Sequence, residues 1–122
     1  MNLQEIKRII DRFAEDISPG LIACDFFDRD GFSIYGINSN PEVCAIFSHL
    51  TYVIHKSLES TELPKMKYYT IFSEENSMMV VVDLGKGYQF GALIDQTKTT
   101  PGLVFSVALP RLINDLKKML PD

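Results

Sequence analysis

The chain has 122 residues and a formal net charge of -4, with 46% hydrophobic and 23% charged residues. This composition is that of an ordinary globular protein and excludes a disordered or low-complexity chain, and the length suits one hydrophobic core, so we expect a single domain over residues 1–122. Lys and Arg form no basic cluster, which argues against a nucleic-acid partner.

The first elements in chain order are a helix and a hairpin. Apolar residues recur at helical spacing over residues 3–17, with charged residues between them, and Pro19 ends this amphipathic helix. Residues 21–27 and 32–37 have the pattern of strands. Residues 28–31 combine Asp and Gly, which favour a tight turn, so the two strands are predicted to form a β-hairpin.

A second helix is expected from Asn40 to about Ser60. Asn40 can cap its N-terminus, and Pro41 suits the first helical position because its missing donor is not needed there. No formally charged residue occurs from Val43 to His55. This is the most informative stretch of the chain, because an exposed helix face in a protein of this charge would normally carry Lys and Glu.

The two faces of this helix differ in character. One is expected to pack on the core and comprises Val43, Ile46, Phe47, Leu50, Val53, Ile54 and Leu58. The other holds Ala45, Ser48, His49, Tyr52 and His55. Small residues together with Tyr and His predict a face that meets a second polypeptide. Burial within the same subunit is the alternative, and a membrane-lying helix is disfavoured because it would need a basic polar face.

Three strands are predicted in the second half of the chain. They lie at residues 67–73, 78–84 and 88–95, and turns at residues 74–77 and 85–87 separate them. The strand at 78–84 is apolar on both faces, which predicts a central strand covered on both sides.

A closing helix is expected to start near Pro101, after a cap at Thr99 or Thr100. Pro110 lies inside this helix. Because proline lacks a backbone donor and crowds the carbonyl of Ser106, we expect a kink or a break there.

The order of elements predicts an α+β fold, in which a five-stranded antiparallel sheet is flanked by three helices. Helices on both faces of the sheet would complete a sandwich. If the strand at 67–73 lies at the edge, its unpaired backbone groups need a partner or protection. Two copies could pair there across a twofold axis and bring their second helices together, which places Lys67, Tyr69 and Ile71 in the same dimer interface. The alternative is an exposed edge guarded by Lys65 and Lys67.

Local motifs for catalysis, cofactors or metals are missing from the sequence. His49 and His55 lie roughly 120° apart around a helix and do not converge on one metal, so interface or capping roles are expected. Residues 25–36 are a poor calcium loop because position twelve is Gly36 and not Glu. Residues 85–87 lack the spacing of a phosphate loop. We therefore predict no enzyme, no cofactor and no metal site.

The cysteines and the lengths of the apolar runs indicate the cellular compartment of the protein. Cys24 and Cys44 stand in apolar surroundings without CxxC spacing, so buried, reduced thiols are expected in preference to a disulfide. No signal peptide is visible, and no apolar run approaches the roughly 20 residues that span a bilayer. These features predict a cytoplasmic protein without membrane insertion.

As a whole, the pattern resembles the roadblock/dynein-light-chain family, a branch of the profilin-like and longin-like folds. The resemblance covers nearly the whole chain. It is most specific over residues 88–95, followed by residues 102–104 and the Leu-rich closing helix. The turn at residues 28–31 and the strand at 78–84 support it.

The resemblance implies one helix on one face of the sheet, two on the other, and dimers built through the middle helix and the third strand. Family members are scaffolds or regulators, commonly of small Ras-like GTPases, and a similar bacterial protein stimulates the GTPase of a polarity and gliding switch. For this chain, the resemblance implies a homodimeric GTPase regulator or scaffold. It identifies no catalytic arginine; Arg29 and Arg111 are merely available. A small-molecule sensor of a related sandwich fold is the alternative, and it would need a pocket between sheet and helix.

Overall fold

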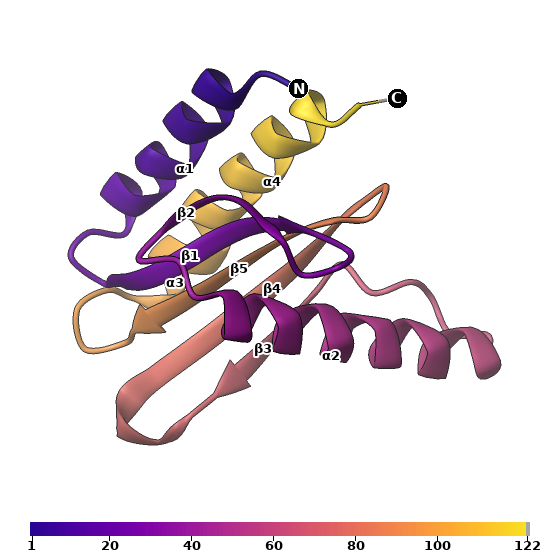
Figure 1. Cartoon of the computed structure of the whole chain (residues 1–122). Helices are drawn as coiled ribbons and strands as arrows, with labels where there is room; N and C mark the ends of the chain where they lie inside the picture. Colours follow the sequence, from indigo (N-terminus) through magenta and orange to yellow (C-terminus); the bar gives the residue numbers. More distant parts are fainter. Residues whose placement is uncertain (122) are drawn as a thin grey trace.

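The computed structural model describes residues 1–121 and contains a five-stranded antiparallel sheet, in which the strands are ordered β2-β1-β5-β4-β3 (Figure 1). The strands are β1 (Leu21–Asp28), β2 (Ser33–Ile37), β3 (Tyr68–Phe72), β4 (Ser77–Gly85) and β5 (Tyr88–Asp95). The predicted sheet and its antiparallel pairing are therefore confirmed. β3 lies at one edge, as the dimer hypothesis requires, and β2 lies at the other.

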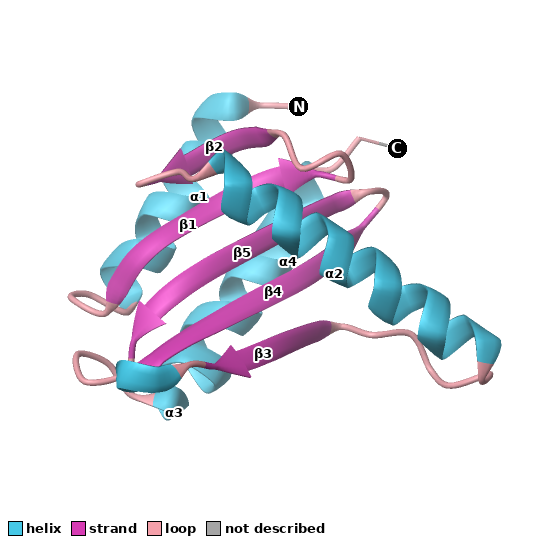
Figure 2. Cartoon of the chain, turned by 60° about the horizontal axis from the view of Figure 1, so that its bottom comes forward, coloured by secondary structure: helices cyan, strands magenta, loops and turns pink. Residues whose placement is uncertain are grey.

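Helices cover both faces of the sheet. α1 (Leu3–Asp16) and the closing helical segment lie on one face, and α2 (Pro41–Ser60) crosses the other face alone (Figures 1 and 2). The closing segment consists of α3 (Pro101–Leu103), the π-helical η2 (Val104–Ala108) and α4 (Leu109–Met119). This arrangement confirms the predicted α+β sandwich and the distribution of helices that the resemblance implied.

β4 shows why the sheet needs cover on both faces. Its neighbouring residues Val80 and Val81 are both fully buried, although their side chains point to opposite faces. Val80 belongs to the large core beneath α1 and α4, where Phe13 and Phe90 meet edge to face with their ring centroids 5.3 Å apart. Val81 belongs to a much smaller cluster beneath α2. The two layers of the protein are therefore unequal in size.

The expected helix caps are present. The side chain of Asn40 accepts hydrogen bonds from the backbone N–H groups of Glu42, at 3.1 Å, and Val43, at 3.3 Å. The hydroxyl of Thr100 accepts one from Leu103, at 3.2 Å. These bonds satisfy donors that the first turn of a helix leaves unpaired. None of the helices within residues 1–121 is long and apolar enough to cross a membrane.

The interruption expected at Pro110 takes the form of a π-helical turn just before it. At the end of η2, the N–H of Leu109 bonds to the carbonyl of Val104, five residues earlier. α4 then starts at Leu109. The wider turn shifts the hydrogen-bond register, so that the missing donor of Pro110 falls in the first turn of α4, where it is tolerated.

Both cysteines are buried free thiols, as predicted. Burial raises the pKa of Cys24 to about 12. Burial, assisted by the nearby carboxylate of Asp25, raises the pKa of Cys44 to about 12 as well. Because the thiolate is the reactive form, neither cysteine should react with Ellman's reagent at pH 8 in the folded protein. Both should react in guanidinium, and rapid labelling of the folded chain would contradict this prediction.

Candidate interaction surface

The face that α2 turns toward the sheet differs from the predicted one. Its buried residues are Cys44, Phe47, Ser48 and Thr51. Of the seven residues expected to form the core face, only Phe47 is buried, while Ile46 and Val53 are 56% and 43% exposed. Since successive helix residues are about 100° apart, the helix is rotated by roughly 90° from the predicted orientation.

Close approach of α2 to the sheet explains this rotation. Phe47 packs on Gly91, where an added Cβ would lie 2.6 Å from the phenyl ring, and its ring centroid lies 6.5 Å from that of Phe27. Small residues flank Phe47 on this face. The Ser48 hydroxyl donates to the carbonyl of Arg29, and the Thr51 hydroxyl donates to the carbonyl of Phe47 at 2.9 Å. Polar side chains can therefore be buried here because they are hydrogen-bonded.

The predicted interface residues of α2 fall into two groups. Ala45, His49 and Tyr52 lie on the exposed side of the helix, and Tyr52 is 60% exposed. The prediction that Ser48 faces a second polypeptide was wrong, because this residue is buried against its own subunit. His55 is half-buried, and its Nε2 lies 2.7 Å from Oδ2 of Asp83 on β4, so it also contacts its own sheet. Both lie too close to the sheet to form the centre of an outer surface.

The rotation creates an apolar outer face on α2, which we define as Ala45, Ile46, His49, Tyr52 and Val53. All five are exposed, and none carries a formal charge with His neutral. The C-terminal turns of the helix also project beyond the strands (Figures 1 and 2). An exposed apolar stripe of this kind, without Lys or Glu, is typical of a surface that another molecule covers.

Phe32 extends this surface and was missed by the sequence analysis, which assigned it to a strand. It precedes β2 and is 70% exposed. Its neighbour Gly31 packs so close to the backbone of Ala45 that an added Cβ would lie 3.0 Å from the Cα of Ala45. The hairpin turn therefore sits beside the first turns of α2. An apolar residue directly after the Asp-rich turn was the available signal in the sequence.

A buried carboxylate fixes the start of α2 above the hairpin. Asp25 accepts hydrogen bonds from the hydroxyls of Ser33, at 2.7 Å, and Ser39, and from the backbone N–H of Asn40 at 3.3 Å. Gly36 makes room for it, since a Cβ there would lie 2.2 Å from Oδ1 of Asp25. The orientation of the outer face is therefore set by bonds from the hairpin to the helix cap.

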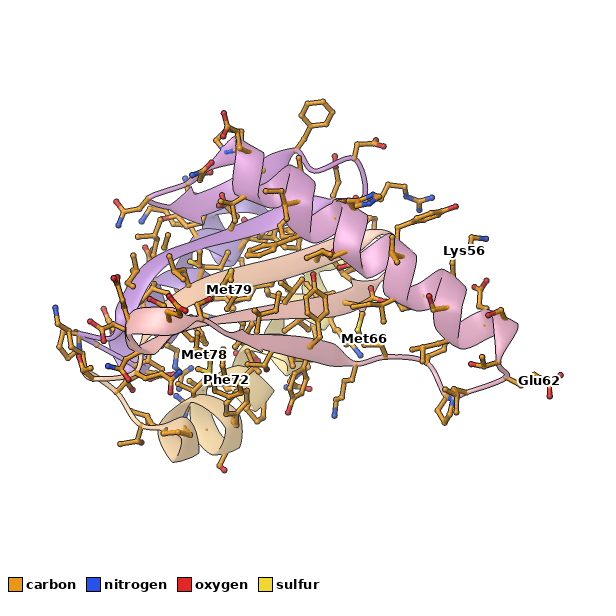
Figure 3. All side chains as sticks on the ribbon, turned by 90° about the horizontal axis from the view of Figure 1, so that it is seen from below. Lys56, Glu62, Met66, Phe72, Met78 and Met79 are labelled. Carbon is orange, nitrogen blue, oxygen red and sulfur yellow. The ribbon has the colours of Figure 1, made fainter. Side chains whose placement is uncertain are left out.

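The edge strand β3 lies beside α2 and shares its side of the sheet. The Tyr69 hydroxyl donates to the carbonyl of Phe47 at 3.2 Å, which links the two elements. Ile71 projects to the same face because side chains alternate along a strand. Figure 3 shows α2 crossing the sheet, with Lys56 near its far end and Phe72 at the end of β3. The outer edge of β3 faces no other strand of the described chain.

The surface offers contact area and an open strand edge, but no group of three or more potential metal ligands occurs within residues 1–121. Neither of the two arginines noted in the sequence belongs to the outer face of α2. Arg111 of α4 pairs with Asp16 at 3.2 Å on the opposite layer. Arg29 lies in the hairpin turn, against Gly87. The arrangement therefore suits docking and pairing with another polypeptide.

Comparison with known proteins identifies the fold of the chain. The sequence matches no protein-family profile and no curated protein. The structure is similar to that of MglB from Myxococcus xanthus, with a TM-score of 0.85, 13% identity, and coverage of 97% of this chain and 89% of that one. It is also similar to the gliding protein MglB from Thermus thermophilus, with a TM-score of 0.80, 10% identity, and coverage of 95% and 88%. A roadblock/LC7 domain from Streptomyces avermitilis aligns with a TM-score of 0.72, 10% identity, and coverage of 87% and 92%. The chain therefore has the roadblock fold, as the sequence resemblance implied.

Proposed function

We propose that this chain is a non-enzymatic, homodimeric interaction module that regulates or scaffolds a small Ras-like GTPase in the cytoplasm. The observation that carries the proposal is the uncharged outer face of α2, on which Ile46, Tyr52 and Val53 are 56%, 60% and 43% exposed. Leaving such side chains in water forgoes about 1.5–3 kcal/mol for each one that could be fully buried. A second protein surface would recover part of this free energy.

A second copy of the chain is the partner that fits both exposed features. Two β3 strands pairing antiparallel across a twofold axis would satisfy the open edges of both sheets. Lys67, Tyr69 and Ile71 would then lie at the seam. Because α2 lies on the same side of the sheet as Tyr69, the same axis would bring the outer faces of two α2 helices together. Ala45, His49 and Tyr52 are the predicted interface residues that remain available for this contact.

The regulatory role rests on the fold and on the resemblance found in the sequence. A dimer of this kind presents a continuous sheet with two helices above it, which is a broad surface for a third polypeptide. The GTPase would supply the nucleotide site and its chemistry, and this chain would select or stabilise one of its conformations. Phe32, at the end of the apolar surface beside α2, is the residue that we expect to contact the GTPase directly.

Co-purification tests the regulatory role. The tagged chain should retain a Ras-like GTPase from its native cell extract, and a Phe32→Glu variant should retain at least about tenfold less, because a charge in an apolar contact costs several kcal/mol. The recovered GTPase should then hydrolyse GTP at a different rate with and without the chain. Leu3→Glu is the matched control, since Leu3 is also an exposed apolar residue but lies on α1, at the other layer of the sandwich. Retention of no GTPase by the wild-type chain would contradict the proposal.

A further inference from the structure

His49 is the residue at the centre of the outer face of α2. The other members of this face precede it by three and four positions and follow it by three and four positions, so all of them are its neighbours on the helix surface. At about 100° per residue, His49 points roughly 150° away from the direction in which the buried residues of α2 point. It is exposed, and its side chain forms no hydrogen bond or ion pair with any of residues 1–121.

The position of His49 makes the charge of the outer face depend on pH. Histidine is the residue type that ordinarily gains its charge between about pH 5 and 8. Of the other residues on this face, alanine, isoleucine and valine do not titrate, and tyrosine does so only in alkaline solution. Mild acid therefore adds one positive charge per subunit to a face that otherwise carries no formal charge.

Charged residues around α2 provide no counter-ion for this position. On the helix itself, the nearest are Glu42 and Lys56, each seven residues from His49, which is about 10.5 Å along the axis. The elements packed against α2 and their turns contribute Asp25, Asp28, Arg29, Asp30, Asp83 and Lys86. None of these residues forms an ion pair with His49. A protonated His49 would therefore be uncompensated within its own subunit.

His55, one and a half turns further along α2, is placed differently. It lies on the inner flank of the helix, in the wall of a pocket of about 570 Å³ that Arg29, Gly87 and Gln89 also line. Its Nε2 is 2.7 Å from Oδ2 of Asp83, so a positive charge on His55 would be compensated by a carboxylate of the same subunit. Of the two histidines, only His49 can therefore make the outer face respond to acid.

The proposed dimer would bring two copies of His49 together. In a twofold contact, a residue at the centre of the shared patch lies beside its own copy. A neutral imidazole has one donor and one acceptor, so two neutral histidines can share a hydrogen bond at the axis. Two protonated histidines have only donors, and they repel each other. Charges of one sign that are desolvated together in an apolar contact weaken association.

We propose that protonation of His49 dissociates the dimer, so that pH controls the association of this chain. The inference rests on the proposed function, because it needs the contact between two α2 helices. Its direction follows from linkage. The separated subunits bind the proton more readily than the dimer does, so dissociation increases as the pH falls. The chain would be dimeric near neutral pH and would separate in mildly acidic solution.

Sedimentation equilibrium of the full chain at about pH 7.5 and about pH 5.5 tests this inference. The dissociation constant of the wild-type dimer should be at least about tenfold higher at the lower pH. His49→Gln keeps a donor and an acceptor but does not titrate, so its two dissociation constants should differ by less than about twofold. His49→Lys carries a permanent charge, and it should be as weakly associated at about pH 7.5 as the wild type is at about pH 5.5.

His55→Gln is the matched control, because it is the same substitution on the same helix, at the histidine that Asp83 compensates. It should keep the pH response of the wild type, and melting temperatures at both pH values check that each variant is folded. A wild-type dimer with the same dissociation constant at both pH values would overturn this inference and leave the proposed dimer intact. So would a pH response that persists in His49→Gln. A wild-type chain that is monomeric at neutral pH would contradict the proposed dimer itself, and this inference with it.

Discussion

A Tyr52→Glu substitution is expected to convert the dimer to a monomer at micromolar concentration. Tyr52 is 60% exposed at the middle of the outer face of α2. The wild-type helix carries no formal charge between Val43 and His55, so the glutamate would be the only one there. In the proposed dimer, the twofold axis would place two such carboxylates close together in an apolar contact. Central interface residues of this type contribute about 2 kcal/mol or more, so the dissociation constant should rise at least about 30-fold.

Multi-angle light scattering and sedimentation equilibrium measure this effect directly. Glu is a good helix former and position 52 is exposed, so the far-UV circular dichroism of the variant should match that of the wild type. Leu3→Glu is the matched control, because Leu3 is a 58% exposed apolar residue on α1, at the other layer of the sandwich. A wild-type chain that remains monomeric at every concentration would remove the basis of the proposal. An unchanged dimer mass in Tyr52→Glu would show that the contact lies elsewhere.

Hydrogen exchange at the edge strand β3 is a second, independent test of the same dimer. If β3 pairs with its twofold mate, its backbone amides should be protected from hydrogen exchange on both edges, although only β4 is its neighbour within the subunit. Loss of this protection in Tyr52→Glu would show that helix contact and strand pairing form one interface.

The element order and the sheet could be predicted from sequence because their signals are local. The cap at Asn40, the turn chemistry of residues 28–31 and the glycines at 85–87 each specify a boundary within a few residues. The apolar character of β4 on both faces predicted its covered position, and Val80 and Val81 are both fully buried. The uncharged length of α2 likewise predicted a surface without ionic groups.

The orientation of α2 could not be predicted because its apolar residues are spread around much of its circumference. Periodicity then gives several faces of similar hydrophobicity, and it favoured the one with the bulkiest side chains. The structure instead buries Cys44, Ser48 and Thr51. That choice depends on Gly91 of β5, which is distant in sequence and lets Phe47 approach the sheet. The only local sign of this orientation in the sequence is the spacing of the small residues Cys44, Ser48 and Thr51 at i, i+4 and i+7, beside the aromatic Phe47.

The pocket lined by Arg29, Gly87 and Gln89 could not be predicted from the sequence either. Gln89 has the ordinary appearance of a polar residue at the start of a strand, and only the packing of α2 above it shows that it is buried without a partner for its Oε1 among residues 1–121. The turn residues Arg29 and Gly87 are far apart in the chain and meet only because β1 and β5 are neighbours in the sheet. Such sites are assembled by topology, for which a single sequence gives no local signal.

A Phe47→Ala substitution is expected to cost about 3–5 kcal/mol in the free energy of unfolding. Phe47 is 5% exposed, and it is the largest contribution of α2 to a cluster whose only other buried members within the described chain are Phe27, Cys44 and Val81. Total stabilities of about 5–15 kcal/mol are usual for proteins of this kind. Removal of the ring would therefore leave the chain near its unfolding midpoint or release α2 from an otherwise folded sheet.

Hydrogen exchange separates these two outcomes. The layer beneath α1 and α4 contains five times as many buried core residues, 20 against four, so it should survive when the layer beneath α2 fails. Amides of α2 should then exchange much faster in Phe47→Ala, while those of β4 and β5 should keep most of their protection. Phe72→Ala is the control, because Phe72 is 68% exposed and its loss should change stability by no more than about 0.5 kcal/mol. Uniform loss of protection would instead show that the two layers unfold as one unit. Release of α2 alone would mean that the helix carrying the proposed dimer contact is the least stable element of the fold, so that association and helix docking would stabilise each other.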